Sequence, residues 1–487
     1  MRLLAAATVL TTALLAGASV APAADIGAND DSAKFAPDGG TALYGQMATL
    51  GLRQTVIGVR FTPSEPLVIQ GKATLDRAIP NAIAAGLKVV LAVYPYPPRE
   101  LEAGLGSPSL FGSYVGAVAS VYPEVKEFVI GNEPNQPAFW RPQFDVRGQN
   151  ASAAAFGQYL AAAYDSLKSV DPAITVVGVG LSPRGNDRPR ARSNISTSPL
   201  RFLRALGAWY RQSGRTRPLM DAFSFHPYPN EATDPLDRGY AWPNAGFVNL
   251  DRLKQGLWDA FHGTAQPTTV DGLKLHLDEV GWQVDTSGLP GYVGAENVPV
   301  TDELTQAVIY GDLVRRAACD PDVAEVSFFG FRDDGARAGF QAALERLDGS
   351  VRPSAAAVQA AIAAGTTGCG ASDAWGPEGD VVGAQVALEP TRGPVIATRI
   401  AAGEDARAIV CARAPVAEVG SGGGAVRSLQ ARGAACHRAT VVGLHAVVVS
   451  VRAPSTVRKR VEVTVELQAE SNRQRRTVVV KEAALHR

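Results

Sequence analysis

Short apolar runs and longer amphipathic segments alternate along residues 24–364. An apolar run of strand length that ends in Gly, Pro or polar residues is typical of a buried strand, whereas apolar positions three and four apart indicate a helix. We therefore predict eight strands, over residues 24–29, 55–61, 88–94, 125–131, 174–180, 221–226, 273–279 and 323–331.

A helix is predicted after each strand, over residues 41–50, 75–85, 109–121, 152–170, 200–212, 250–261, 302–318 and 353–364. In the fourth of these, six apolar side chains fall on one helical face: Phe156, Tyr159, Leu160, Ala163, Tyr164 and Leu167. Thr301 or Asp302 is expected to cap the seventh helix. Eight strand–helix pairs predict an α/β fold of the (β/α)8 TIM-barrel type. The alternative, a doubly wound open sheet, should carry a Gly-rich first turn, and the sequence has none.

The pattern changes after residue 369. Gly- and Ser-rich stretches such as 421–424 separate short β-branched runs at residues 408–411, 440–451, 461–467 and 477–480. These runs predict a small all-β, sandwich-like domain over residues 370–487, after a barrel domain over residues 24–369. The basic residues between 458 and 476 are expected to keep an edge strand solvated or, alternatively, to meet an anionic surface.

Residues 1–23 have the pattern of a secretory signal peptide. Arg2 precedes an apolar stretch over residues 3–15, and small residues lead to an expected cleavage near residues 21–23. The apolar stretch is shorter than the ~20 residues that a membrane span requires. We expect the mature protein to be extracellular, either secreted or associated with the cell wall, and to have no membrane span.

Composition narrows the classes of function. The chain is 46% apolar and 19% charged, which is typical of a globular protein with ample core. Its formal net charge is zero, so nothing favours nucleic acid as a partner. Cys319, Cys369, Cys411 and Cys436 allow three disulfide pairings, of which proximity in the sequence favours Cys319–Cys369 and Cys411–Cys436. The cysteines lack CxxC spacing, and no metal site is predicted.

Two of the predicted strands end at a glutamate. Residues 127–135 read EFVIGNEPN, so Glu133 lies where the fourth strand stops, and Pro134 cannot continue the ladder. Residues 273–282 read LKLHLDEVGW, and Glu279 closes the seventh strand. Because the carboxyl ends of barrel strands meet at one face, these two side chains should meet there. One carboxyl group as proton donor and a second as nucleophile or base is what hydrolysis of a glycosidic bond requires.

These motifs resemble those of the retaining glycoside hydrolases of clan A. The resemblance rests on GNEPN at residues 131–135, FSFHPYP at 223–229 and DEVGW at 278–282, and it covers residues 24–366. With the pair Phe139 and Trp140 after NEPN, the sequence is most similar to glycoside hydrolase family 39, which includes β-xylosidases and exopolysaccharide hydrolases. The resemblance implies a catalytic barrel, a poly- or oligosaccharide substrate and no cofactor.

The resemblance also implies a role for each matching residue. Glu133 would be the general acid/base, Glu279 the nucleophile, and Asn132 a hydrogen-bond donor to the sugar 2-hydroxyl. Three further residues match positions that support the nucleophile or lie beside it: Arg60, Tyr228 and His226. A retaining enzyme needs its two carboxyl groups only ~5–5.5 Å apart, with the pKa of the acid raised by shielding and the nucleophile kept ionised by donors.

Asp278 is the alternative to Glu279 because the two are adjacent. Strand alternation places Leu275, Leu277 and Glu279 on one face, and His276 and Asp278 on the other. An apolar stripe that ends in an acid suits a barrel lumen, so we expect Glu279 to point inward. Asp278 is then expected in the strand–helix layer or behind the site.

Aromatic side chains near the strand ends could stack on sugar faces or pack within loops. The candidates are Tyr94, Tyr96, Trp140, Trp242, Trp282, Phe329 and Phe331. Trp282 is favoured because it follows Glu279 by three residues. The loop after the fifth strand carries Arg184, Arg188, Arg190 and Arg192. These arginines are expected either on a solvated loop or in contact with an acidic or phosphorylated glycan.

The sequence thus predicts a secreted retaining glycoside hydrolase that cleaves β-glycosidic bonds of a poly- or oligosaccharide. A catalytically silent glycan-binding or cell-wall-associated barrel is the alternative, although both glutamates are present. A barrel enzyme for phosphorylated or small-molecule substrates is less favoured, because no Gly-rich phosphate loop follows the seventh and eighth strands.

Overall fold

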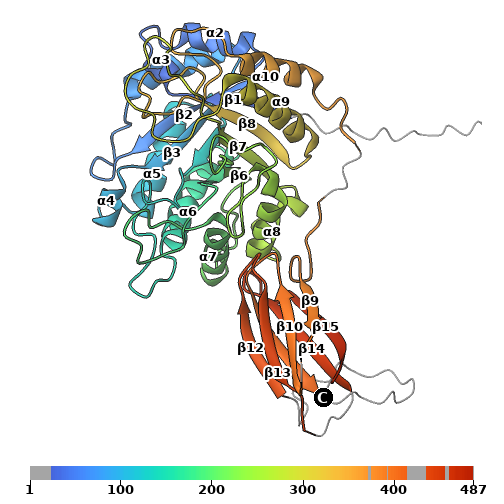
Figure 1. Ribbon diagram of the computed structural model, residues 1–487. Coiled ribbons are helices and arrows are strands. Elements are labelled where there is room, and N and C mark those ends of the chain that lie inside the picture. Colours follow the sequence, from blue (N-terminus) through green and yellow to red (C-terminus); the bar gives the residue numbers. More distant parts are fainter. Residues whose placement is uncertain (1–23, 371–374, 392, 414–434, 456–459, 486–487) are drawn as a thin grey trace, which may run out of the picture.

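The computed structural model describes residues 24–370, 375–391, 393–413, 435–455 and 460–485. The predicted signal peptide, residues 1–23, lies outside the described residues, as do the Gly/Ser-rich stretch 421–424 and residues 458 and 459. The described chain forms a barrel of strands and helices, with a separate pair of antiparallel sheets at one side (Figure 1).

Eight parallel strands close into a barrel in chain order, as predicted. They are β1 (Asp25–Asn29), β2 (Gln54–Phe61), β3 (Lys88–Pro95), β4 (Glu127–Ile130), β5 (Thr175–Leu181), β6 (Ala222–Phe225), β7 (Lys274–Val280) and β8 (Val323–Phe329). Each neighbouring pair is parallel, and the barrel closes where β8 pairs with β1. The predicted (β/α)8 barrel is therefore confirmed.

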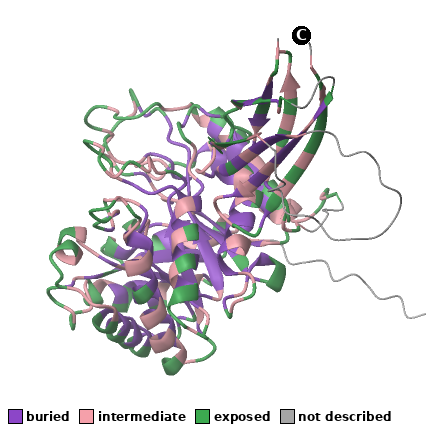
Figure 2. Cartoon of the chain, turned by 90° about the horizontal axis from the view of Figure 1, so that it is seen from below, coloured by how far each residue is buried: buried purple, intermediate pink, exposed green. Residues whose placement is uncertain are grey.

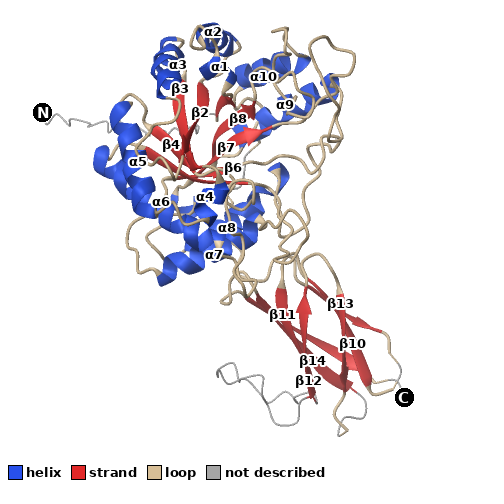
Figure 3. Ribbon diagram, turned by 90° about the vertical axis from the view of Figure 1, so that its left-hand side faces the viewer, coloured by secondary structure: helices blue, strands red, loops and turns tan. Residues whose placement is uncertain are grey.

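Helices surround the strands (Figure 3). They are α1 (Ser32–Phe35), α2 (Thr41–Thr49), α3 (Lys72–Ala84), α4 (Pro98–Glu102), α5 (Pro108–Val121), α6 (Ser152–Val170), α7 (Pro199–Gln212), α8 (Leu250–Phe261), α9 (Glu303–Cys319) and α10 (Pro353–Ala364), with the 3-10 turns η1 (Phe247–Asn249) and η2 (Thr269–Asp271). The cap of α9 is Asp302, whose carboxylate accepts the backbone N–H groups of Leu304 and Thr305. The short helices α1 and α4 were not predicted.

Both faces of the barrel strands are buried, which explains their nearly continuous apolar sequences (Figure 2). On β3, Leu91 and Val93 belong to the large core between strands and helices. The alternating residues Val90 and Ala92 belong to a separate apolar cluster that includes Val129 of β4. This second cluster fills the middle of the lumen.

Below the apolar layer, toward the N-terminal ends of the strands, the lumen holds an ionic cluster. Lys88 contacts Glu325 and lies 3.2 Å from Glu127, and the imidazole of His276 lies 3.3 Å from Glu127 and 3.2 Å from Glu325. Although burial opposes its charge, these carboxylates raise the pKa of His276 to about 10. Two cations thus face two carboxylates, which keeps this closed end of the barrel electrically balanced.

The C-terminal part consists of two antiparallel sheets, with strand orders β13-β10-β9 and β12-β11-β14-β15. The strands are β9 (Gln385–Glu389), β10 (Val395–Ala401), β11 (Ala406–Arg413), β12 (Ala435–Val441), β13 (Val447–Arg452), β14 (Arg460–Ala469) and β15 (Arg476–Ala484). Ile400 and Val449 of one sheet share a core with Val410 and Val465 of the other, as in a sandwich. The all-β prediction is confirmed. The sequence reading missed β9 and β10, and it merged β12 with β13, which a turn at Leu444 (φ 68°) separates.

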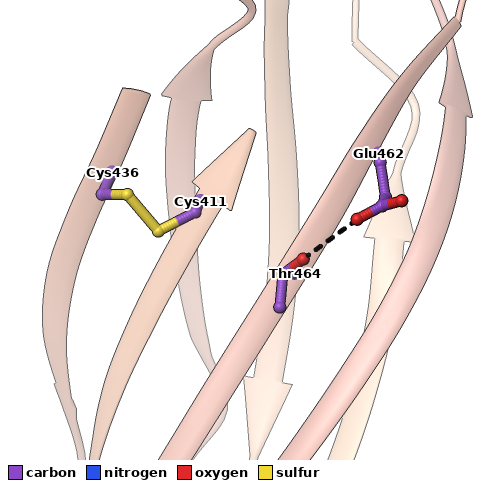
Figure 4. The surroundings of a disulfide bond; sticks show 4 residues. All are labelled: Cys411, Cys436, Glu462 and Thr464. Atoms are coloured by element: carbon purple, nitrogen blue, oxygen red, sulfur yellow. Dashed lines mark hydrogen bonds between the residues drawn. A yellow bond between two sulfur atoms is a disulfide. The ribbon is translucent and has the colours of Figure 1, made fainter. Parts of the chain in front are cut away.

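Both disulfides have the pairing that proximity favoured. Cys319, the last residue of α9, is bonded to Cys369, and Cys411 is bonded to Cys436. Figure 4 shows the second bridge, which links directly opposed residues of β11 and β12. The first bridge therefore lies within the barrel part of the chain and the second within the sandwich.

Ion pairs connect the sandwich to the barrel. Arg475 contacts Asp259 of α8 and Glu404, each at 2.7 Å, and Arg201 of α7 contacts Asp405 at 2.7 Å. The Arg475, Asp259 and Glu404 side chains are almost fully buried, so the sandwich is fixed against α7 and α8. Among the described helices, none is long and apolar enough to cross a membrane.

Candidate active site

Glu133 follows β4 through a sharp change of backbone direction. Gly131 has φ 109°, and a Cβ there would lie 2.7 Å from the carbonyl oxygen of Val179. Glu133 itself has φ 41°, which is rare for a residue with a side chain. Its N–H donates to the Gly180 carbonyl at 2.7 Å, and its carbonyl accepts from Gln136 at 2.8 Å. These bonds hold a strained backbone that delivers the carboxylate to the barrel mouth.

Glu279 reaches the site as predicted, but the predicted assignment of the other β7 residues to the lumen and to the helix layer is wrong. Leu275 and Leu277 belong to the core between strands and helices, whereas His276 and the neighbouring Asp278 face the lumen. Near its end β7 shifts register against β8, between Leu277 and Val280. Such a bulge re-aims the residues after it, so both Asp278 and Glu279 contact lumen groups. The predicted apolar stripe faces outward because the helix layer is the more apolar side.

The two glutamates meet at His226, which directly follows β6. The His226 Nδ1 lies 3.2 Å from Glu133 Oε1 and 3.4 Å from Glu279 Oε2. One oxygen of each glutamate and one imidazole nitrogen all lie within 4.8 Å of one another. The predicted meeting of Glu133 and Glu279 at the ends of strands four and seven is therefore present, with His226, which follows strand six, beside both.

Two neutral donors also point at Glu279. The hydroxyl of Tyr228 donates to Oε2 at 3.1 Å, and the amide of Asn29, at the end of β1, donates to Oε1 at 3.4 Å. The second amide contact of Asn29, 3.2 Å to the Asp278 carbonyl, fixes its side chain. Both carboxylate oxygens of Glu279 are thus held in a defined orientation.

Asp278 lies on the other side of His226. Its carboxylate accepts a hydrogen bond from Ser224 and lies 3.4 Å from His226 Nε2. The imidazole therefore lies between three carboxylates. Sequence reasoning missed Ser224, although Ser224 on β6 is two residues before His226, so that alternation places both on the lumen side.

Charge in the site follows from this packing. Burial opposes a charge on His226, but the carboxylates of Glu279 and Asp278 outweigh it and hold the pKa of the imidazole well above its ordinary value. Burial raises the pKa of Glu279 to about 7, although the His226 charge and the Tyr228 hydrogen bond lower it. Desolvation is the larger effect, so the donors around Glu279 offset only part of it.

Glu133, His226 and Glu279 could each offer one ligand atom to a metal ion. The surrounding carboxylates, however, raise the pKa of the imidazole and so favour its charged form, and an imidazolium has no free lone pair for a metal. A positive charge on His226 offsets part of the negative charge of the three surrounding carboxylates. The chemistry of these residues thus fits an acid–base site better than a metal site.

Arg60 lies at the rim of the site. Its Nε donates to the Tyr94 hydroxyl at 3.4 Å, and its guanidinium lies 4.8 Å from the centre of the Tyr96 ring. Within the described residues Arg60 forms no ion pair with Glu279, so its predicted support of the nucleophile is at most indirect. Tyr94 is half-buried and packs edge-on against Phe139, at 6.3 Å between ring centres.

Two tryptophans expected to stack on sugars do not line the cleft. Trp282 is 2% exposed and donates from Nε1 to the Asp234 carbonyl, and Trp140 is 3% exposed between Phe156 and Tyr159. Both predictions are wrong because these rings pack behind the loops that carry the two glutamates. Trp242, a weaker candidate, lines a cavity at the junction with the sandwich.

Other groups take the place of those tryptophans at the barrel mouth. Asn132 is half-buried next to Glu133, and the described residues offer its side chain no hydrogen bond. Phe329, at the end of β8, and Phe340 are half-buried and pack edge-on with Tyr228 and with each other. Phe340 lies in a long loop without a recognisable motif, so no sequence pattern could indicate it.

The two glutamates line a cleft of about 950 Å³. Loops after β4, β5, β6, β7 and β8 form its walls, and its lining includes Glu133, Glu279, Tyr228, Arg184 and Phe340. This volume is typical of ligand-binding clefts, and both carboxyl groups belong to the lining.

Comparison with known proteins adds likenesses of fold. No protein-family model and no curated protein matches the chain. Among solved structures, a family 39 glycoside hydrolase from the gut symbiont Bacteroides cellulosilyticus WH2 is 14% identical, with 79% of this chain and 71% of that chain covered and a TM-score of 0.48. The exo-beta-1,4-mannosidase Op5Man5 from Opitutaceae bacterium strain TAV5 is 13% identical, with 72% and 62% covered and a TM-score of 0.43. GH5_18 from Streptomyces cattleya, in complex with GlcNAc, is 14% identical, with 74% and 84% covered and a TM-score of 0.47.

The chain is thus structurally similar to glycoside hydrolases, among them a member of family 39, the family that its motifs resemble. Because the identities are low and the TM-scores are below 0.5, the reaction is inferred below from the geometry of the two glutamates and not from these proteins.

Proposed function

We propose that this protein is a retaining glycoside hydrolase that cleaves β-glycosidic bonds of a poly- or oligosaccharide. The observation that carries the proposal is the pair Glu133 and Glu279, with oxygens within 4.8 Å at the floor of a large cleft. This spacing suits a direct attack by one carboxylate while the other transfers a proton.

In the first step Glu133 protonates the leaving glycosidic oxygen while Glu279 attacks the anomeric carbon. The bond to the leaving oxygen breaks, and a glycosyl ester forms on Glu279. The donors Tyr228 and Asn29 fix the carboxylate for in-line approach. Positive charge on His226 stabilises both carboxylates as the proton leaves Glu133.

In the second step the ionised Glu133 deprotonates a water molecule, which attacks the anomeric carbon. The ester breaks, Glu279 is released as a carboxylate, and Glu133 regains its proton. Two inversions give overall retention. Since the reaction begins with proton transfer to the leaving oxygen, the active form of the closely interacting pair carries one proton.

The test uses a panel of aryl β-glycosides and polysaccharides with wild type, Glu133→Gln and Glu279→Gln. Glu133→Gln should lose about 10²–10⁴-fold on poor leaving groups but retain its first step on activated ones. Glu279→Gln should be inactive until azide replaces the nucleophile. Glu231→Gln is the matched control, because Glu231 lines the same cleft but contacts neither glutamate.

One combination of results would refute the hydrolase proposal. If wild type hydrolyses nothing while it and both variants bind glycans equally well, the protein is a glycan-binding barrel and not a hydrolase.

We also propose, from the signal-like pattern of residues 1–23, that the mature chain is exported. Mass spectrometry of the N-terminus from culture medium and cell wall tests this, with cleavage expected near residues 21–23.

A further inference from the structure

The loop after β5 forms a second hollow, of about 1030 Å³, beside the catalytic cleft. Four arginines line it: Arg147, Arg188, Arg190 and Arg192. We call this the basic hollow. All four side chains are exposed, and among the described residues none of them has an ion-pair partner.

Two acids also line the basic hollow, but both carboxylates already accept hydrogen bonds from the protein. Asp145 accepts the N–H groups of Arg147 and Gln149, each at 2.8 Å. Asp187 accepts the N–H of Ser198 at 2.8 Å and lies 3.7 Å from Arg201. The lining therefore carries an excess of positive charge, although the chain as a whole has a formal net charge of zero.

The basic hollow adjoins the catalytic cleft. Asn186 lines both, and Arg184 and Asn194, which flank the arginines in the same loop, line the cleft that contains Glu133 and Glu279. The loop is anchored to neighbouring segments, since Arg184 donates to the Asn230 carbonyl at 2.9 Å and the Gly185 N–H donates to the Asn244 side chain at 2.9 Å. A glycan that extends past Asn186 from the two glutamates enters this hollow.

We propose that the substrate is an anionic glycan, whose carboxylate or sulfate groups bind the basic hollow while a neighbouring glycosidic bond lies at the two glutamates. This inference rests on the proposed function of the cleft. Guanidinium forks match carboxylate and sulfate oxygens in a bidentate manner. Because salt screens exposed charges beyond about 10 Å, the arginines act only on anions that bind within the hollow itself.

The experiment measures how tightly three fluorescent probes bind the full-length protein. The three probes are equal in length. They are a β-1,4-linked oligoglucuronate, a sulfated cello-oligosaccharide and the neutral cello-oligosaccharide. The test variant is Arg188→Gln/Arg190→Gln/Arg192→Gln. The control is Arg53→Gln/Arg438→Gln/Arg452→Gln, which removes the same charge from exposed positions outside both hollows.

The wild type should bind at least one anionic probe more tightly than the neutral one, and the two anionic probes show whether carboxylate or sulfate is preferred. The test variant should lose about tenfold in affinity for that probe, the sum of three exposed ion pairs, and salt should reduce the difference. Equal binding of anionic and neutral probes by the wild type, or equal losses in the test and control variants, would overturn the proposal.

Aryl β-glycosides separate this proposal from the function of the cleft, because they are too small to reach the basic hollow. The test variant should hydrolyse them at the wild-type rate. If the wild type hydrolyses none of them but binds anionic probes through the arginines, the hydrolase proposal fails and the hollow remains an anionic-glycan site.

Discussion

Removal of the Tyr228 hydroxyl should move the pH dependence of catalysis in a predictable direction. This hydroxyl donates to Glu279 at 3.1 Å, and its own pKa is held well above the ordinary value by burial and by the nearby carboxylates, so it stays a donor across the working range. A hydrogen bond to a charged group contributes about 1.5–3 kcal/mol, which corresponds to about 1–2 pKa units. Tyr228→Phe should therefore raise the pKa of Glu279 by that amount.

The nucleophile must be ionised, so kcat/KM of the wild type should fall as the pH drops through about 7, the pKa of Glu279. In Tyr228→Phe this acidic limb should lie at about pH 8–9, and at pH 6 the rate should be about 10–100-fold below wild type. The assay is hydrolysis of an activated aryl glycoside across pH 5–10.

Tyr122→Phe is a matched control, because it also removes a tyrosine–carboxylate hydrogen bond, to Asp76 at 2.9 Å, but outside the cleft. Its pH profile should equal that of the wild type. An acidic limb that stays in place or moves to lower pH in Tyr228→Phe would refute the role given to this hydroxyl.

Three further predictions concern the same site. Gly131→Ala should lower the free energy of unfolding by about 1–3 kcal/mol, measured by urea unfolding, whereas Gly45→Ala, with nothing within 4 Å of the new Cβ, should not. Glu279→Gln should stabilise the protein at pH 8 more than at pH 4: folding raises the pKa of this acid from 4.5 to about 7, so the folded wild type loses stability as pH rises through that window. Thermal melts that show no pH-dependent gain would contradict this. Asp278→Asn should lower the pKa of His226, which NMR titration can follow; an unchanged value would show that the 3.4 Å contact contributes little.

The strands and helices of the barrel could be predicted because apolar runs of strand length and apolar positions three and four apart are both clear in this sequence. Predicted and observed strand limits differ by only a few residues, as for β2 and β8. Glu133 was identifiable because Gly131 and Pro134 mark the end of β4 in the sequence itself. The positive φ of Glu133 was not foreseeable, because it depends on hydrogen bonds to Gly180 and Gln136.

The direction of side chains on β7 was not predictable from alternation. Alternation assigns residues to two faces but does not say which face is the lumen, and in this barrel the lumen carries His276 and Asp278. The bulge before Val280 then brings Glu279 into the site as well. Likewise, the distance of Trp282 from Glu279 along the chain could not show that its ring is buried against Asp234 and Tyr310.

The central claim is that Glu133 and Glu279 act together in a double displacement. Proton NMR of the first sugar product from a β-glycoside, recorded before mutarotation, tests it most directly. The close spacing of the two carboxyl groups predicts the β anomer, that is, retention. Initial formation of the α anomer would contradict the account, because it would mean that water and not Glu279 attacks the anomeric carbon.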